Sequence, residues 1–180
     1  LKEVWGCPVT LNNDAELGAL GEWAYGAGRG ERNLAYIKVG TGVGSGLLLD
    51  GQLYSGATGS AGEIGHVTID ENGPLCTCGN RGCLEAFAGG GAIARRAAEA
   101  VKRGQRTQLA EVVSNPDFSA ADVMRVARRG DLVAQRIVAE AGAHLGTAIA
   151  SMVNLFNPSM VVIGGSISQI GDLLLEPIRT

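Results

Sequence analysis

The stretch MVVIGGSIS at residues 160–168 indicates the fold class of the chain. Its first four residues are apolar without interruption, which is typical of a strand buried on both faces of a sheet. Gly164 and Gly165 follow this strand, and a further helical segment is predicted within residues 167–179. The order of strand, glycine turn and helix predicts an α/β fold.

Apolar patterning extends this prediction over the rest of the chain. We predict helices over residues 15–25, 92–103 and 132–153 and after Ser119, and strands over residues 33–39 and 46–50. Asp14 stands at the start of the first helix, where capping and the helix dipole favour a carboxylate. Ser119 and Asp122 form an approximate capping box. Asp50-Gly51 predicts a two-residue hairpin turn.

Glycine is the unusual component of the composition. It accounts for 28 of 180 residues, and by position 21 of these fall in residues 1–91 and 7 in residues 92–180. The first half must therefore contain many tight turns or close backbone approaches. Hydrophobic residues make up 46% of the chain and charged residues 18%, which is enough apolar material for a core and argues against disorder.

The net charge and the lack of membrane-spanning and signal segments argue against some classes of function. A net charge of −3 and a pI of about 5.4 disfavour a general nucleic-acid-binding surface. We find neither an apolar run long enough for a membrane span nor a secretion signal, so we expect a cytoplasmic protein without a membrane partner. The chain starts without Met and ends without an obvious closing element, so we expect a fragment.

His66, Cys76, Cys78 and Cys83 lie within 18 positions, inside a long glycine-rich stretch at residues 55–91. Three cysteines and one histidine are a standard set for a tetrahedral structural zinc site, and a metal would stabilise a loop that lacks a core of its own. Disulfides are the rival interpretation. Zinc is favoured because Cys76 and Cys78 are poor partners for each other and no secretion signal is present. Cys7 stands apart and is predicted to be a small buried hydrophobe.

The sequence GTGVGSG at residues 40–46 follows a predicted strand. Its alternating glycines allow backbone N–H groups to approach a phosphate. It matches neither a Walker A loop nor a dinucleotide-binding fingerprint, so a kink in a β-hairpin is an equally good interpretation.

Asp14, Glu63 and Glu85 are candidate ligands for a polyol. Glu63 precedes His66 by three residues and Glu85 follows Cys83 by two. If a metal folds residues 66–83 into a compact knot, both glutamates leave it at its rim, where fixed acceptors suit the hydroxyls of a polyol. A plain helix cap for Asp14 and solvated glutamates are the default alternatives.

Together these motifs resemble the ROK family of repressors and sugar kinases. The motifs are Asn13-Asp14-Ala15, GTGVGSG at 40–46, GATGSAGEIGH at 56–66, CTCGNRGCLE at 76–85 and NPSMVVIGGSIS at 157–168. The resemblance implies an actin- and hexokinase-like (ribonuclease H-like) sugar-kinase fold. Residues 1–30 would then end an N-terminal domain and hinge, and residues 31–180 would form the C-terminal sugar- and nucleotide-binding domain with a zinc loop at 63–85.

The resemblance also implies roles for single residues. The family's catalytic base matches Asp14, and its sugar ligands match Asn13, Asp14, Glu63, His66 and Glu85. His66 would serve both zinc and sugar. The nucleotide loops match two sets of residues, which are Gly40, Thr41, Gly42 and Gly44 at the phosphates and Gly164 and Gly165 near the adenosine. ATP and Mg²⁺ are the cofactors of such a kinase.

Several departures bear on the choice between kinase and regulator. Family kinases carry an Asp-x-Gly-Gly-Thr phosphate loop, and family repressors carry a winged helix-turn-helix ahead of the fold. Neither pattern is present here. Glu16 stands where Asn is common, Leu84 replaces the Trp of many family glucokinases, and GVGSGLLLDGQLYSGATG at 42–59 looks more like regulator members.

We therefore favour the effector domain of a regulator that senses a hexose or related sugar. DNA would be contacted only through an N-terminal segment, and a homodimer or homotetramer is expected from the family. The alternative is an ATP-dependent sugar kinase in which Asp14 deprotonates a hexose hydroxyl that attacks the γ-phosphate. A third interpretation is a zinc-stabilised interaction protein without a ligand.

Overall fold

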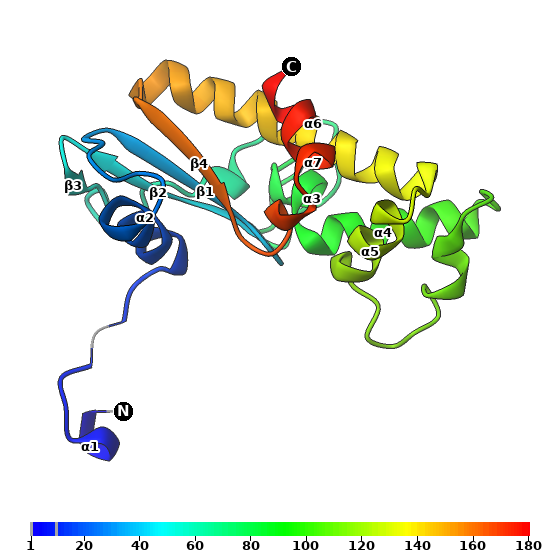
Figure 1. Ribbon diagram of the computed structural model, residues 1–180, viewed down its shortest axis with the longest axis horizontal. Helices are drawn as coiled ribbons and strands as arrows, with labels where there is room; N and C mark the ends of the chain where they lie inside the picture. The colour runs from blue at the N-terminus through cyan, green and yellow to red at the C-terminus, as the bar shows by residue number, and fades with distance from the viewer. Residues whose placement is uncertain (1, 10) are drawn as a thin grey trace.

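The computed structural model describes residues 2–9 and 11–180. Its α-helices are α1 (Lys2–Trp5), α2 (Asp14–Tyr25), α3 (Glu85–Ala88), α4 (Gly90–Lys102), α5 (Ala120–Arg128), α6 (Leu132–Phe156) and α7 (Asp172–Arg179). The strands are β1 (Leu34–Val39), β2 (Val43–Leu49), β3 (Gln52–Leu53) and β4 (Met160–Gly164). Three short 3-10 helices are η1 (Ile64–His66), η2 (Gln108–Glu111) and η3 (Ser168–Ile170). Figure 1 shows α1 apart from the rest of the molecule.

The strands form one mixed sheet in the order β3-β2-β1-β4. β1 pairs with β2 in antiparallel and with β4 in parallel orientation, so the long segment between β2 and β4 contains the crossover. The turn between β2 and β3 is the one predicted at Asp50 and Gly51, whose φ angles of 55° and 80° suit a primed hairpin turn. The α/β fold predicted from the sequence is therefore confirmed.

Helix α2 covers one face of the sheet because small residues let it approach closely. A Cβ atom at Gly46 of β2 would lie 2.5 Å from the carbonyl oxygen of Ala15 and 2.7 Å from the Cβ atom of Ala19. On the α2 side, Gly18 leaves room for the ring of Tyr36. A small cluster that includes Leu34 and Leu48 is buried between helix and sheet. Close packing of β2 against α2 therefore accounts for the glycines in β2.

The opposite face of the sheet carries the main hydrophobic core. Ala35, Ile37 and Val39 of β1 point into it, where they join buried side chains of α3 to α7. Helix α6 contacts α7 closely, because Cβ atoms at Gly142 and Gly146 would each lie 2.7 Å from a carbonyl oxygen of α7. The start of α5 is confirmed as a capping box at Ser119 and Asp122.

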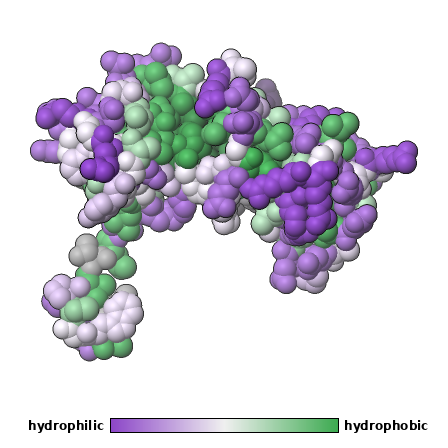
Figure 2. Space-filling view, in the orientation of Figure 1, coloured by the Kyte–Doolittle hydropathy of each residue, from purple (hydrophilic) through white to green (hydrophobic). Residues whose placement is uncertain are grey.

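Strand β4 lies at an edge of the sheet, where its side chains pack against hydrophobic clusters on both faces without the full burial that was predicted. All five of its residues are only partly buried. A groove of about 560 Å³ runs beside β4 and α7, and Figure 2 shows this area as a green, hydrophobic surface. An apolar run identifies a strand but does not say whether another strand pairs with its outer edge.

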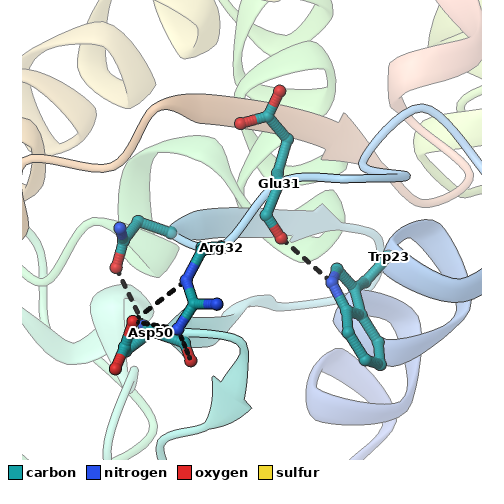
Figure 3. A network of polar contacts seen from close by, with 5 residues as sticks. Trp23, Glu31, Arg32 and Asp50 are labelled. Carbon is teal, nitrogen blue, oxygen red and sulfur yellow. Dashed lines mark hydrogen bonds and ion pairs between the residues drawn. The ribbon is translucent and has the colours of Figure 1, made fainter.

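A network of polar contacts holds the connections around the β2–β3 turn (Figure 3). The guanidinium of Arg32 donates to Asp50 Oδ1 at 2.5 Å, and Asn33 Oδ1 accepts from the backbone N–H of Asp50 at 2.9 Å. The indole N–H of Trp23 donates to the carbonyl oxygen of Glu31 at 3.0 Å, which ties α2 to the segment before β1.

Most predicted element boundaries shift by a few residues. β2 begins at Val43, three residues earlier than predicted, α4 begins at Gly90, and α6 continues to Phe156. Cys7 is exposed, so its predicted burial is wrong. None of the helices among residues 2–9 and 11–180 combines the length and the apolar character that crossing a membrane requires.

Candidate functional site

The glycine-rich segment at residues 40–46 divides into a turn and a strand. The backbone N–H of Gly40 donates to the carbonyl oxygen of Gly42 at 2.9 Å, and β2 starts at the next residue. The turn therefore joins β1 and β2 as a tight hairpin. Within the described residues, the backbone N–H groups of Thr41 and Gly42 donate to no other residue, so they are free to bind an anion.

Glu85, the first residue of α3, lies over this hairpin. Its Oε2 atom accepts from the backbone N–H of Val43 at 3.0 Å. A Cβ atom at Gly42 would displace the same carboxylate from this position. This contact orients Glu85, while its Oε1 atom has no hydrogen-bond partner among the residues that the structure describes.

Asn13, not Asp14, is the N-cap of α2. The Oδ1 atom of Asn13 accepts from the backbone N–H groups of Ala15 at 2.8 Å and Glu16 at 3.4 Å. Asp14 is the first helical residue, and its Oδ2 atom forms an ion pair with Lys38 of β1. The interpretation of Asp14 as a simple helix cap is therefore wrong, since its side chain points toward the sheet instead of back onto its own helix.

Asn13, Asp14 and Glu85 share a common feature: the protein holds each side chain through one polar atom. Asn13 Nδ2, Asp14 Oδ1 and Glu85 Oε1 have no partner within the described part of the chain. One donor and two acceptors are thus oriented and available to a ligand. Glu63 differs, because it is exposed and its side chain forms no hydrogen bond with another described residue.

The structure brings His66, Cys76, Cys78 and Cys83 together, with their ligand atoms all within 4.8 Å of one another. The Sγ atoms of Cys78 and Cys83 are 3.7 Å apart, and Cys76 Sγ lies 3.7 Å from His66 Nδ1. In a tetrahedral site with Zn–S bonds of about 2.3 Å, two sulfur atoms lie about 3.8 Å apart. All four cysteines are free thiols, so the cluster could hold a metal ion, as the spacing predicted.

Backbone contacts close the loop around this cluster. Thr68 pairs with Cys83 and Leu75 with Arg81 in isolated β-bridges. Gly82 has a φ angle of 67°, and a Cβ atom there would collide with the carbonyl oxygen of Asp70. These turns position the four side chains beside a small buried cluster of Cys76, Cys83 and Ala86, while Ile64 and Leu84 at the ends of the segment join the main core.

The protonation of the thiols depends on their surroundings. Burial raises the pKa of Cys76, but hydrogen bonds from the Cys78 backbone and from His66 outweigh burial and lower the pKa to about 7. Burial raises the pKa of Cys83 to about 12, with further contributions from hydrogen bonds to Cys78 and Cys76. Without a cation the cluster therefore keeps at least one proton at neutral pH, and a bound metal ion would displace it.

A cavity of about 330 Å³ lies on the other side of the β1–β2 turn. Gly40, Thr41 and Ser166 line it, together with residues of α4, of α5 and of the segment just before α5. Gly164 and Gly165 do not line it; Gly165 has a φ angle of 93° and turns the chain so that Ser166 does. The sequence carried no signal for the lining residues from α4, α5 and the segment before α5, which are Gly90, Gly91, Ala94, Phe118, Ser119, Ala120, Ala121 and Met124.

Lys38 was also missed by sequence reasoning. A lysine in the otherwise apolar strand LAYIKV is the signal that could have identified it. Lys38, Asp14 and Gly40 meet at the same end of the sheet, since the Cε atom of Lys38 lies 3.9 Å from the position of a Cβ atom at Gly40.

Comparisons with known proteins identify the family of the chain. The model of the ROK family matches residues 1–180. A glucokinase of Halalkalibacterium halodurans is 44% identical over 181 residues, which cover 99% of this chain and 55% of the relative. A xylose repressor of Caldicellulosiruptor bescii is 36% identical over 179 residues, which cover 99% of this chain and 45% of the relative.

Solved structures show the same two kinds of relative. A ROK family glucokinase from Streptomyces griseus, in complex with glucose and AMPPNP, aligns with a TM-score of 0.88 at 35% identity over 99% of this chain and 58% of its own. A ROK family transcriptional regulator, a homolog of the E. coli MLC protein, aligns with a TM-score of 0.88 at 35% identity over 99% of this chain and 44% of its own. The chain spans about half the length of the curated relatives it matches. The family model and these alignments establish that the chain belongs to the ROK family.

Proposed function

We propose that this chain is the sugar-binding part of a ROK-family transcriptional regulator, with a hexose or related sugar as its effector. The observation that carries the proposal is the set of oriented, unpartnered polar atoms on Asn13, Asp14 and Glu85 around the β1–β2 turn. The regulator-like sequence at residues 42–59 favours sensing.

The chemistry of these groups suits a polyol. The Asn13 amide donates a hydrogen bond, and the carboxylates of Asp14 and Glu85 accept bonds from hydroxyl groups. His66 would add one more contact through the ring nitrogen that faces away from Cys76, and Glu63 would reach the sugar from its exposed position. A site built to pair with several hydroxyls rejects analogues that lack them, because its polar groups are then left unpaired.

We propose that zinc occupies the cluster of His66, Cys76, Cys78 and Cys83 as a structural ion. The donor set and the sulfur separations support this proposal. Zinc would hold His66 in one orientation. Glu85 lies two residues after Cys83, so the same loop would also position Glu85. The metal would act on sugar binding only through these side chains.

An ATP-dependent sugar kinase is the second candidate, and the 44% identity to a glucokinase favours it. Asp14 would then be the base that accepts the proton of the attacking hydroxyl. The free N–H groups of Thr41 and Gly42 would hold nucleotide phosphates, the neighbouring Gly40 and Gly44 would keep the turn open, and Gly164 and Gly165 would shape the edge near the adenosine. Mg²⁺ would neutralise phosphate charge.

The remaining expectations concern the whole protein. We propose that residues 1–30 lead from an N-terminal lobe through a hinge to the lobe formed by residues 31–180. We further propose a cytoplasmic homodimer or homotetramer. Contact with DNA would belong to another part of the protein, since this chain carries a net charge of −3.

Sugar binding by the full-length protein tests the first candidate. A panel of hexoses, pentoses and N-acetylated sugars is screened for a rise in melting temperature, which reports binding to the folded state. Glu85→Ala should abolish the rise, while Glu111→Ala, on an exposed segment, should preserve it. If a sugar binds and also changes affinity for operator DNA, the regulator is supported; if no sugar binds, the proposal is wrong.

ATP consumption with the same sugars tests the second candidate. Turnover that is lost in Asp14→Asn would support a kinase with Asp14 as base. Turnover that persists in Asp14→Asn would refute that assignment, and absence of turnover with every binding sugar would leave the regulator as the conclusion.

A further inference from the structure

Lys38 of β1 is a charged side chain in a strand whose other residues are apolar or aromatic. In the sheet it stands opposite Gly44 of β2 and Gly164 of β4. Both flanking residues are glycines, so neither contributes a side chain beside Lys38, although the ring of Tyr36 fills the space over Gly164. Gly44 packs against Ala15, so the path of the lysine on this side leads to the first turn of α2.

At the end of this path the ammonium group of Lys38 forms an ion pair with Asp14 Oδ2. The side chain of Lys38 is 34% exposed and that of Asp14 72% exposed. The same lysine passes close to Gly40 of the β1–β2 turn. Lys38 thus connects the helix that carries Asp14 with the turn on which Glu85 rests.

The ion pair engages only one of the two carboxylate oxygen atoms of Asp14. Oδ2 is taken by Lys38, and Oδ1 has no partner among the described residues. A carboxylate that is largely exposed and otherwise unbonded would sample several rotamers, and each would aim Oδ1 differently. Such exposed ion pairs contribute little to the stability of the fold, so a structural role does not explain the arrangement.

We propose that Lys38 is a positioning residue, which holds Asp14 by Oδ2 so that Oδ1 faces a hydroxyl group of the sugar. This inference rests on the proposed sugar site. It assigns to Lys38 an effect on ligand affinity that is transmitted through Asp14, without direct contact between Lys38 and the sugar.

The test uses the full-length protein and titration calorimetry with the sugar that binds the wild type most tightly. Lys38→Met should weaken binding about tenfold, the loss expected when one oriented hydrogen bond to a charged group is weakened. Lys38→Arg keeps the cation and should restore most of the affinity. Lys102→Met, which removes an exposed lysine at the end of α4, is the matched control and should bind like wild type.

A double-mutant cycle with Asp14→Asn separates action through Asp14 from direct contact. In the Asp14→Asn background, Lys38→Met should change affinity by less than about twofold, because the carboxylate that Lys38 holds is already gone. The melting temperature of sugar-free Lys38→Met should stay within about 2 °C of wild type.

Three results would overturn the inference, and they are distinguishable. A full tenfold loss in both backgrounds would mean that Lys38 contacts the sugar itself. Unchanged affinity in Lys38→Met, while wild type binds sugar, would refute the role of Lys38 and leave the proposed function intact. Failure of wild type to bind any sugar would overturn the proposed function and this inference with it.

Discussion

Two regions of the molecule are stabilised by different kinds of interaction. We define them as the metal loop at residues 63–85 and the helical half at residues 92–180. The helical half buries long stretches of α4, α5, α6 and α7 in one continuous hydrophobic core. The metal loop buries two of its cysteines in a small local cluster, and Ile64 and Leu84 near its ends join the main core. Between them the loop contains isolated β-bridges, glycine turns and the Cys3His cluster.

This difference has a functional consequence. In the helical half the loss of a single side chain is spread over many neighbours. In the metal loop, four clustered side chains that could hold a metal ion precede Glu85. The candidate sugar site should therefore depend more on the metal loop than on the core, although the core supplies most of the stability.

The largest effect is expected from Cys83→Ser in the metal loop. Cys83 is fully buried, and serine is a much poorer zinc ligand than a thiolate. We expect zinc content to fall from about one ion per chain to almost none, with loss of the sugar-induced rise in melting temperature. Elemental analysis of the purified protein and limited proteolysis within the loop measure the change.

The control for this variant is Cys7→Ser, since Cys7 is exposed and far from the cluster in sequence. It should retain zinc and sugar binding. Full zinc content together with native protease resistance in Cys83→Ser would show that the loop does not need its metal ligands, and the contrast with the helical half would disappear.

The second effect concerns the core of the helical half. Leu145 of α6 is fully buried, and Leu145→Ala should lower the free energy of unfolding by about 2–5 kcal/mol because it removes apolar contacts and leaves a cavity. Urea denaturation gives this number. Leu132→Ala, at a site that is 78% exposed in the first turn of the same helix, should change it by less than about 0.5 kcal/mol.

Zinc content distinguishes the two regions in the same experiment. Folded Leu145→Ala should keep its metal, since none of the four ligands belongs to α6. If this variant instead lost zinc in proportion to its stability, the two regions would unfold as one unit and would not be separable.

The third prediction concerns the pH dependence of stability at Asp131, the N-cap of α6. Burial raises the pKa of this carboxyl, but hydrogen bonds from the N–H groups of Ala134 and Gln108 and from the Thr107 hydroxyl outweigh burial, and the pKa lies below its ordinary value of 3.8. The resulting stabilisation is fully present above that value and is lost as the pH falls through the lowered pKa.

Asparagine keeps a capping oxygen but loses the Oδ2 acceptor of the Thr107 hydroxyl and the Gln108 N–H. Asp131→Asn should therefore lower the free energy of unfolding by about 1–2 kcal/mol near neutral pH, and the difference from wild type should shrink below about pH 4. Urea denaturation over this pH range measures both. Asp117→Asn at an exposed position is the control. A difference that grows toward acid pH would contradict the assignment.

The smallest change in stability is expected at the β2–β3 turn of the sheet. Arg32 and Asp50 form an ion pair whose side chains are 70% and 84% exposed. Arg32→Ala should change the free energy of unfolding by less than about 1 kcal/mol, because exposed charges remain solvated and are screened. Urea denaturation of Asp50→Asn, of Arg32→Ala and of the double variant gives the coupling energy of the pair. A coupling energy above about 1 kcal/mol would show that this turn also contributes substantially to stability.

Local patterns explain which parts of the fold could be predicted. The helix at 132–153 and the hairpin at Asp50-Gly51 were found because spacing and turn chemistry are encoded within a few residues. The start of β2 was missed, since Val43 to Ser45 alternate with glycines that read as loop. Their strand character comes from pairing with β1 and from the contact of Gly44 and Gly46 with α2.

The candidate site divides in the same way. The four candidate metal ligands were predicted from residue type and spacing, and the structure brings them together. The pairing of Asp14 with Lys38, the hydrogen bond from Val43 to Glu85 and the cavity beside Thr41 join residues that are distant in sequence, so no local pattern could reveal them.

The sequence by itself determined the fold class, the four residues that could hold a metal ion and the family, because each depends on residue types at short or fixed spacings. Only the tertiary structure decided that β4 lies at an edge, that Asn13 caps α2, and that Lys38 reaches Asp14. These features depend on which surfaces meet after the sheet has formed, and contacts of that kind are set by the packing of the whole chain rather than by any single stretch of it.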